Sequence, residues 1–281
     1  MIRGVGEHLD RGPLSRDELA ARVARDIPSG SYVNLGIGQP TTVADHLPPG
    51  SGVVLHTENG MLGMGPAAVG DEIDPDLINA GKVPVTELPG AASFHHADSF
   101  AMMRGGHLDV CVLGAFQVSA TGDLANWHTG APDAIPAVGG AMDLAIGAKQ
   151  VFVMMTLFAK DGTPKLVREC TYPLTGVGCV DRLYTDVAII AHGPQGASIL
   201  ETYGTSYDQL AARLDVLLVD PRTLHVRERG AAANTSPPRP SRRVRPCPRA
   251  SGSPPGSRWS RTTHRSAAPR ESATGSRCWP C

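Results

Sequence analysis

A single acidic residue stands between a predicted strand and a cluster of glycines. Residues 55–63 have the sequence LHTENGMLG, in which an apolar run leads directly to Glu58. The end of a strand is a rigid mount for a side chain. A glutamate with an ordinary pKa of about 4.3 is anionic at neutral pH, so it can attack an activated acyl carbonyl without a neighbouring general base. The segment therefore predicts a nucleophilic carboxylate at position 58.

The glycines that follow Glu58 suit such a nucleophile. Attack on a carbonyl produces an oxyanion, which backbone N–H groups stabilise, and glycine lets the main chain come close enough to supply them. Gly60, Gly63 and Gly65 are candidates by their position. From the residue types alone, an equally good interpretation makes Glu58 a surface or salt-bridged acid beside an ordinary glycine turn.

The segments around this turn predict an α/β fold. Residues 15–27 predict an amphipathic helix, because Ser15 and Glu18 have the spacing of a capping box and an apolar stripe follows. Short apolar runs predict buried strands at 32–35, 53–56, 108–113, 151–157 and 187–190. Further helices are predicted at 41–46, 97–103, 141–146 and 206–214, the last with a second capping-box pair, Ser206 and Gln209. Hairpins are predicted at 114–126 and 157–167. This order predicts a mixed, mostly parallel sheet with flanking helices.

Charge divides the chain into two regions. Residues 1–226 carry 14 Lys and Arg against 25 Asp and Glu, whereas residues 227–281 carry 12 Arg against 2 Glu. We therefore predict one domain at 1–220 and a disordered tail, rich in Arg, Pro and Ser, at 227–281. The tail composition is also typical of a GC-rich reading frame translated out of register, and this frameshift interpretation is preferred to a genuine tail. The acidic body argues against nucleic-acid binding there.

The body of the chain has the composition of a globular protein. Its 281 residues include 41% apolar ones, enough for one sizeable core. The longest apolar run, at 151–159, is far shorter than the roughly 20 residues that a membrane helix needs. Cys111, Cys170 and Cys179 lack metal-type spacing and are expected to be reduced thiols. We expect a cytoplasmic location, without export or membrane insertion.

Six blocks of the sequence share one resemblance. The first is the segment around Glu58, and the others are NLGIGQP at 34–40, DLINAGK at 76–82, SFAMMRGGH at 99–107, GGAMDL at 139–144 and TYPLTG at 171–176. Together, and in their order along the chain, they resemble the B subunit of family I CoA-transferases. The first block departs from the family only at Thr57, where serine is usual. The resemblance covers roughly residues 15–218, and it implies the fold shared by CoA-transferases and sugar-phosphate isomerases.

This resemblance implies a reaction and a partner. In the family, the glutamate at the position of Glu58 carries CoA as a covalent thioester, and no separate cofactor takes part. Residues 94–100 and 126–130 resemble members that transfer CoA from succinyl-CoA to 3-oxoadipate, and acetoacetate is the alternative acceptor. A separate A subunit is expected, in an A2B2 heterotetramer, so that this chain alone is inactive. We expect the site to be closed, because water would hydrolyse the thioester.

The resemblance also implies roles for other residues. The candidates for contacts to the oxyanion or to CoA are Gly36, Gly38, Asn59, Gly60, Gly139 and Gly140. Arg104 or Lys165 is a candidate partner for the distal carboxylate of a dicarboxylic acceptor, although a surface salt bridge is the favoured interpretation of each.

Two further hypotheses concern the remaining residues. His95, His96, His107 and His128 match no zinc-binding spacing, and we predict no metal site. A non-catalytic α/β protein, whose glycine loops hold phosphate or a nucleotide, is the alternative to an enzyme. Under that hypothesis, replacing Glu58 leaves ligand binding intact.

Overall fold

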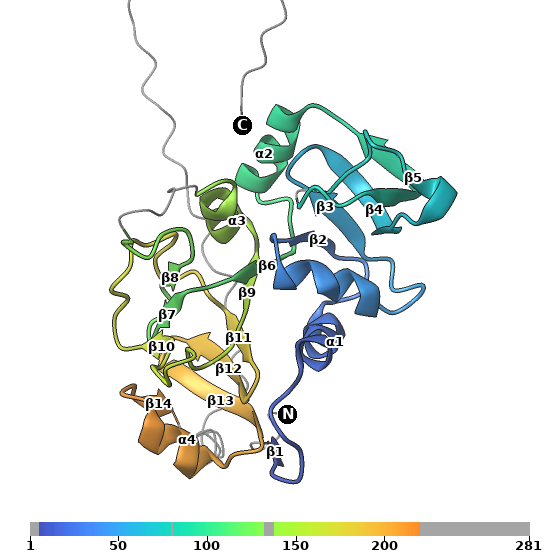
Figure 1. The fold of residues 1–281 in the computed structure, drawn as a ribbon. Helices are drawn as coiled ribbons and strands as arrows, with labels where there is room; N and C mark the ends of the chain where they lie inside the picture. The colour runs from blue at the N-terminus through green and yellow to red at the C-terminus, as the bar shows by residue number, and fades with distance from the viewer. Residues whose placement is uncertain (1–5, 80, 132–137, 220–281) are drawn as a thin grey trace, which may run out of the picture. The chain divides into compact units, whose positions relative to one another are not determined.

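The computed structural model describes residues 6–79, 81–131 and 138–219 (Figure 1). The tail predicted at 227–281 lies outside these residues. Within the described ranges, no helix is both long enough and apolar enough to cross a membrane.

A large sheet of eleven strands forms the centre of this part of the chain. Its order is β1-β13-β12-β11-β9-β6-β2-β3-β4-β5, and β14 also pairs with β13. The strands are β1 (Gly6–His8), β2 (Tyr32–Leu35), β3 (Val54–Thr57), β4 (Met61–Ala67), β5 (Val85–Ser93), β6 (Val110–Gly114), β9 (Gln150–Met155), β11 (Arg182–Thr185), β12 (Ala188–Gly193), β13 (Gly196–Tyr203) and β14 (Leu218–Val219).

The central strands run parallel, antiparallel pairs flank them, and β1 and β14 pair in parallel with β13 at one edge. Strands β11, β9, β6, β2 and β3 are parallel to their neighbours in that order. On one side β4 and β5 continue the sheet with antiparallel pairing, and on the other side β12 and β13 do the same. The prediction of a mixed, mostly parallel sheet is confirmed.

The helices lie close to their predicted positions, and two of them begin at predicted caps. They are α1 (Arg16–Asp26), α2 (His96–Arg104), α3 (Ala141–Gly147), α4 (Tyr207–Arg213) and the 3₁₀ turns η1 (Gln39–His46) and η2 (Gly70–Glu72). The predicted capping boxes Ser15/Glu18 and Ser206/Gln209 are both present. The helix predicted at 41–46 is instead a 3₁₀ turn that begins near Pro40.

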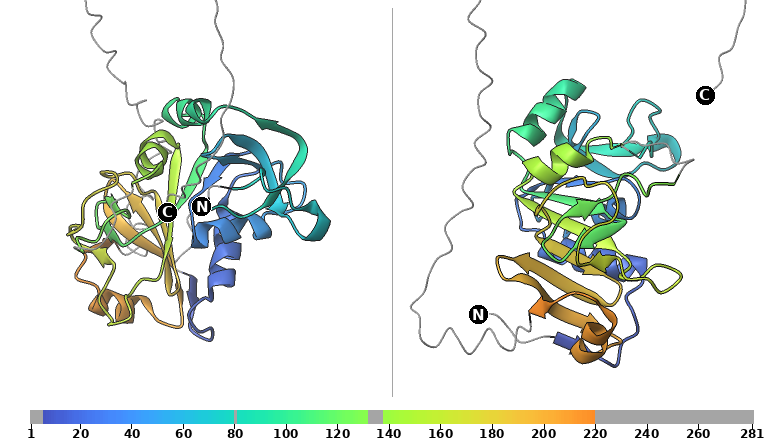
Figure 2. Two further views of the ribbon diagram at one scale, coloured as in Figure 1. Left: turned by 45° about the horizontal axis from the view of Figure 1, so that its top comes forward. Right: turned by 90° about the vertical axis from the view of Figure 1, so that its left-hand side faces the viewer.

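The two faces of the sheet pack against different helices. Because successive side chains of a strand point to opposite faces, Val110 and Val112 of β6 join a core with α1, whereas Cys111 and Leu113 join a core with α2 and α3. Figure 2 shows α1 on one side of the central strands and α3 on the other. Burial on both faces explains why these strands are continuous apolar runs in the sequence.

The two predicted hairpins differ in outcome. Strands β7 (Gln117–Ser119) and β8 (Leu124–Ala125) form the hairpin expected at 114–126. In the second segment, only one antiparallel bridge, between Phe158 and Pro164, is present among the described residues. Its outgoing half becomes β10 (Leu166–Val167), which pairs in parallel with β7. Within this segment the Lys165 N–H still donates to the Leu157 carbonyl at 2.9 Å, whereas the Lys165 and Val167 carbonyls accept from the N–H groups of Val118 and Ala120 at 3.0 and 2.8 Å.

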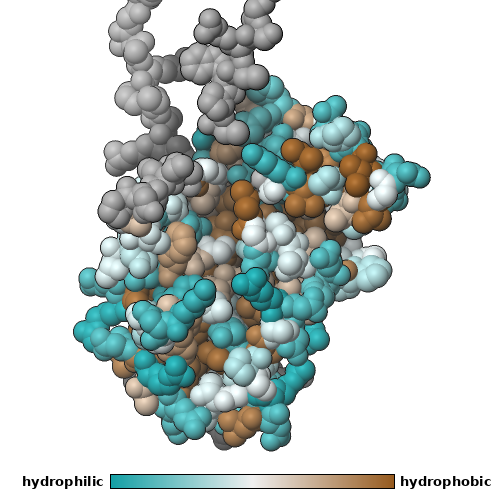
Figure 3. All heavy atoms as spheres, in the orientation of Figure 1, coloured by the Kyte–Doolittle hydropathy of each residue, from teal (hydrophilic) through white to brown (hydrophobic). Residues whose placement is uncertain are grey.

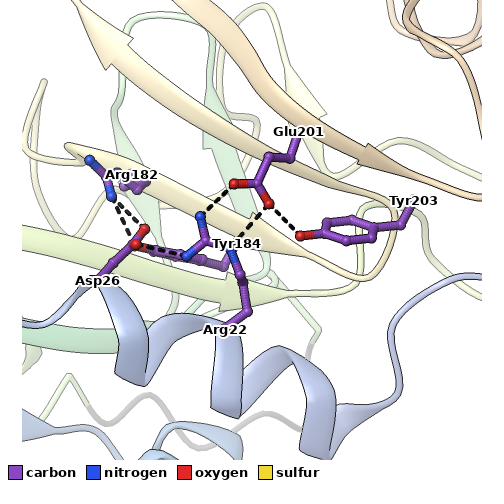
Figure 4. Close-up of polar contacts among 6 residues, drawn as sticks. All are labelled: Arg22, Asp26, Arg182, Tyr184, Glu201 and Tyr203. Carbon is purple, nitrogen blue, oxygen red and sulfur yellow. Dashed lines mark hydrogen bonds and ion pairs between the residues drawn. The ribbon is translucent and has the colours of Figure 1, made fainter. Parts of the chain in front are cut away.

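A network of charged side chains joins α1 to strands β11 and β13 of the sheet (Figure 4). Arg22 makes two hydrogen bonds to Glu201 of β13, at 2.7 and 3.1 Å, and an ion pair of 2.7 Å with Asp26. Asp26 in turn accepts from Arg182 and Tyr184 of β11. Burial, the largest single influence, raises the pKa of Asp26 and Glu201, but the hydrogen bonds from Arg22 and from Tyr184 or Tyr203, together with the nearby arginine charges, outweigh it and both pKa values fall.

We predict that this network makes the fold sensitive to acid. A carboxylate whose pKa is lowered by folding stabilises the folded state above its ordinary pKa, which is 3.8 for Asp26 and 4.5 for Glu201, and this stability is lost as the pH falls below those values. Glu201→Gln should lower the free energy of unfolding at pH 7 by about 2 kcal/mol and weaken its fall below pH 4.5. Urea unfolding at several pH values measures both effects.

The control for this variant is Asp215→Asn, which removes the exposed ion pair between Asp215 and Arg168. Exposed pairs contribute little, so this variant should unfold like the wild type. Equal losses in the two variants would contradict a special role for the Arg22 network.

Candidate active site

A cavity opens at the carboxyl ends of the central parallel strands. Its volume is about 600 Å³, and its walls come from segments directly after β2, β3, β6 and β9. Parallel strands place their carboxyl ends at one edge of a sheet, which is where open α/β sheets bind ligands. The lining residues used below are Arg16, Gly36, Glu58, Phe116, Asn126, Gly139, Gly140 and Lys165.

Glu58 stands in a tight turn between β3 and β4. Thr57 pairs with Met61 across this turn, and the Thr57 carbonyl accepts a hydrogen bond of 3.2 Å from the Gly60 N–H. Thr57 Oγ1 accepts from the Met61 N–H at 3.1 Å. The hydroxyl that Thr57 shares with serine therefore holds the turn.

Gly60 is required for packing of the main chain. Its φ is +113°, and a Cβ there would lie 2.2 Å from the Phe94 carbonyl oxygen. The Gly60 carbonyl accepts from the Phe94 N–H at 2.9 Å. Asn59 points elsewhere, and its side chain donates to the Ile78 carbonyl at 2.7 Å. Neither Asn59 nor Gly60 lines the cavity.

The Glu58 carboxylate lies against the backbone of Gly140. A Cβ added to Gly140 would be 2.5 Å from Glu58 Oε2, so only glycine leaves room for the carboxylate here. Burial raises the pKa of Glu58, whereas a hydrogen bond from the Gly140 N–H and the nearby His96 lower it in part. The outcome is a half-buried carboxylate that has lost part of its hydration, faces the cavity and keeps one backbone donor.

The other glycine candidates divide between the cavity and its surroundings. Gly36 and Gly139 line the cavity, and Gly38 does not. Gly36 must be small, because a Cβ would lie 3.0 Å from the Val112 carbonyl oxygen. Gly38 has a φ of +90° and begins η1, so its part is to turn the chain after β2.

The two basic candidates occupy different environments. Lys165 lines the cavity, and burial lowers its pKa, with a partly opposing effect of Asp186. Arg104 lies outside the cavity, where its exposed side chain forms a 2.6 Å ion pair with Asp143. For Arg104 the structure therefore shows the salt bridge that the sequence analysis favours.

Two residues of the site, Arg16 and Phe116, carry no signal of function in the sequence. Arg16 lines the cavity from the first turn of α1, and Phe116 lines it from the segment before β7. Asn126, which belongs to the block at 126–130, lines it from the segment after β8. Their convergence depends on which strands are neighbours, which residue spacing does not show.

The histidines do not form a metal centre within the described residues, where no group of three or more His, Cys, Asp or Glu is placed to hold an ion. His95 caps α2, because its Nδ1 accepts from the Ala97 N–H at 3.1 Å. His96 packs edge-on against Phe100.

Comparison with known proteins decides the family. A profile of the family described as coenzyme A transferase matches residues 16–199. This chain belongs to the coenzyme A transferase family. The matched region contains Glu58 and every cavity-lining residue named above, and it agrees with the resemblance over 15–218.

Individual members of the coenzyme A transferase family are similar over most of the chain. The B subunit of 3-oxoadipate CoA-transferase from Acinetobacter baylyi is 61% identical over 208 residues, which are 74% of this chain and 96% of that protein. The B subunit of succinyl-CoA:3-ketoacid coenzyme A transferase from Helicobacter pylori is 45% identical over 201 residues, which are 71% of this chain and 96% of that protein.

A solved structure supports the fold of this coenzyme A transferase chain. The acyl-CoA transferase from Escherichia coli O157:H7 superposes with a TM-score of 0.59 over 75% of this chain, at 19% identity. This chain spans 43% of that longer chain. The likeness confirms the α/β fold expected from the sequence.

We predict that Gly140→Ala inactivates the site without unfolding the protein. The new Cβ meets the mobile end of Glu58, so the carboxylate is displaced while the backbone φ of −81° stays ordinary. CoA-transfer activity should fall by at least about tenfold. The melting temperature should stay within about 2 °C of the wild type.

The control is Gly193→Ala, because a Cβ at Gly193 meets no atom within 4 Å. This variant should match the wild type in both activity and melting temperature. Full activity in Gly140→Ala would show that Glu58 does not need its present position.

Proposed function

We propose that this chain is the B-type subunit of a CoA-transferase that moves CoA from succinyl-CoA to 3-oxoadipate through a thioester on Glu58. The observation that carries the proposal is the half-buried Glu58 carboxylate, which faces the cavity beside the Gly140 N–H. The relative from Acinetobacter baylyi, with 61% identity, supports the choice of acceptor.

In the proposed reaction the Glu58 carboxyl group acts first as a nucleophile and then as the acyl group that accepts CoA. Glu58 attacks the thioester carbonyl of the donor and expels the CoA thiolate, which leaves a mixed anhydride. The thiolate then attacks the Glu58 carbonyl carbon, and the donor acid leaves as a carboxylate. The acceptor carboxylate repeats these steps in reverse, so CoA is transferred, Glu58 is regenerated and no water is consumed. The steps require no metal and no organic cofactor.

The surroundings of Glu58 support each step. Partial loss of hydration makes the carboxylate a stronger nucleophile, and its position beside a bound thioester provides a high effective concentration. The Gly140 N–H, with Gly36 and Gly139 nearby on the cavity wall, is a candidate donor to the oxyanion of each intermediate.

We assign Lys165 to the distal carboxylate of the acceptor. A cation that loses hydration in a cavity gains from an anionic partner, and 3-oxoadipate supplies a second carboxylate that acetoacetate lacks. The similarity to the Helicobacter pylori enzyme favours a simpler 3-oxo acid as the second candidate acceptor.

A partner chain is part of this proposal. Both of these relatives are named as the B subunits of their enzymes, and we propose an A subunit that completes the site in an A2B2 assembly. Apolar side chains are exposed around and on β5, at Val69, Ile73, Val83 and Leu88, and Figure 3 shows apolar surface in this part of the molecule. Such surface is typical of chains that associate. The isolated chain should therefore show no turnover.

We predict a covalent adduct on Glu58. The chain is co-expressed with its A subunit and given succinyl-CoA alone, and intact mass with peptide mapping should locate CoA on the peptide that contains Glu58. Glu58→Gln should form no adduct and lose turnover, because an amide is not a nucleophile here.

The matched control for this experiment is Glu169→Gln, an exposed glutamate outside the cavity, which should keep both adduct and turnover. A complex that forms but yields no adduct would contradict the proposal. Retained ligand binding in Glu58→Ala, without any exchange activity in the wild type, would support a non-catalytic binding protein instead.

We predict that Lys165 selects the acceptor. Lys165→Met should lower kcat/KM for 3-oxoadipate by about 10-fold to 100-fold and leave acetoacetate, where it is a substrate, much less affected. Arg104→Met tests the other candidate and should change neither value greatly. A loss of equal size for both acids in Lys165→Met would show that Lys165 supports the site in general and does not select the acceptor.

A further inference from the structure

Three polar side chains lie buried directly behind the Glu58 turn. Asn34 of β2, His56 of β3 and Ser99 of α2 are exposed by 1%, 2% and 0%. None of them lines the cavity, and the proposed reaction does not use them. Polar groups are buried in such a place at a cost unless they are hydrogen-bonded, so their connections matter.

The three side chains form one chain of hydrogen bonds. Asn34 Nδ2 lies 3.1 Å from His56 Nδ1, and His56 Nε2 lies 2.9 Å from Ser99 Oγ. Ser99 Oγ donates to the Thr57 carbonyl at 2.9 Å. This series of hydrogen bonds thus begins on β2 and ends on the peptide group that links Thr57 to Glu58.

The donors and acceptors agree with only one state of His56. The Asn34 amide donates both to His56 Nδ1 and to the His56 carbonyl, at 3.2 Å, so Nδ1 must accept. Ser99 gives its proton to Thr57, so Nε2 must carry a proton and donate to Ser99. A charged imidazole would place its Nδ1–H against the Asn34 amide protons. Consistent with this, burial lowers the pKa of His56 to about 4.

The series of hydrogen bonds ends at the Thr57 carbonyl, which anchors the turn. One lone pair of the Thr57 oxygen accepts from the Gly60 N–H, and the other accepts from Ser99. The first bond closes the turn on itself. The second is the one that ties the turn to α2, and it fixes the plane of the peptide group from which Glu58 departs.

We propose that His56 and Ser99 are positioning residues, which orient the Thr57–Glu58 peptide group so that the Glu58 carboxylate is aimed at the thioester. This inference rests on the proposed function of Glu58 as the nucleophile. These residues affect the rate at which Glu58 attacks the thioester, because misplacement of a reacting group by about 1 Å lowers the rate roughly 100-fold. Binding of the acyl-CoA, which depends on the cavity walls, is unaffected.

The central test is Ser99→Ala in the complex with the A subunit, with succinyl-CoA as the probe. The variant leaves the Thr57 carbonyl and the His56 Nε2–H without their shared partner. At saturating succinyl-CoA the rate of adduct formation should fall by about tenfold to a hundredfold, while the concentration for half-saturation stays within about twofold.

A matched control separates positioning from general stability. Ser119 is also fully buried, and its hydroxyl also makes one bond as acceptor and one as donor: it accepts from the Asp123 N–H and donates to the Asp123 carboxylate. It lies in β7, outside the cavity. Ser119→Ala should lose a similar amount of thermal stability and still form the adduct at the wild-type rate.

Substitution of His56 provides a test by rescue. Glutamine offers an amide NH2 group that can donate to Ser99 and a carbonyl that can accept from Asn34, the two roles that neutral imidazole fills, so His56→Gln should recover much of the rate. His56→Leu has a similar size and neither group, and it should be as slow as Ser99→Ala.

The outcomes distinguish this inference from the proposed function. A wild-type complex without adduct overturns the function itself, and the inference falls with it. A wild-type complex with adduct, together with an unchanged rate in Ser99→Ala, overturns only the positioning role. Equal slowing of Ser99→Ala and Ser119→Ala, or of His56→Gln and His56→Leu, would also overturn it.

Discussion

The Thr57 carbonyl is the point on which the site depends. Its oxygen accepts from Gly60 within the turn and from Ser99 of α2, so one peptide group is held from two directions. The same turn joins a parallel strand to an antiparallel one, because β3 follows β2 in the sheet while β4 returns beside it. Glu58 therefore projects at the carboxyl edge of the sheet from backbone that cannot move independently of β2 and α2.

Two glycines near Glu58 have different structural roles. Gly60 allows a positive φ and the close approach of the Phe94 backbone, and so it permits the turn to exist. Gly140 has an ordinary backbone conformation, and its lack of a Cβ leaves space for a carboxylate. Substitution of the first disturbs the fold, whereas substitution of the second disturbs the functional group.

The charged groups of this chain also have two different roles, one in stabilising the fold and one in the cavity. The network around Arg22 and Asp26 joins α1 to β11 and β13 and stabilises the fold away from the cavity. At the cavity, Glu58 and Lys165 are both partly buried. Burial raises the pKa of Glu58 and lowers that of Lys165, so in each case it favours the neutral form. Such groups lack full compensation within the chain, and ligands that carry the opposite charge or an electrophilic carbonyl are their natural partners.

The sequence alone determined the local features of this protein. Glu58 after an apolar run, the capping boxes at Ser15 and Ser206, and the apolar runs of β2, β6 and β9 all follow from interactions between residues close in the chain. Strand β4 was not predicted, because Gly63, Gly65 and Pro66 interrupt its pattern, and only pairing with β3 and β5 makes it a strand.

Only the tertiary structure decided which residues meet. It brought Gly140 to the Glu58 carboxylate and Lys165 to the same cavity, and it left Asn59, Gly38 and Arg104 outside. It also joined Asn34, His56 and Ser99 into one chain of hydrogen bonds. These contacts depend on the order of strands in the sheet and on the side from which each helix packs, and residue spacing along the chain carries neither kind of information.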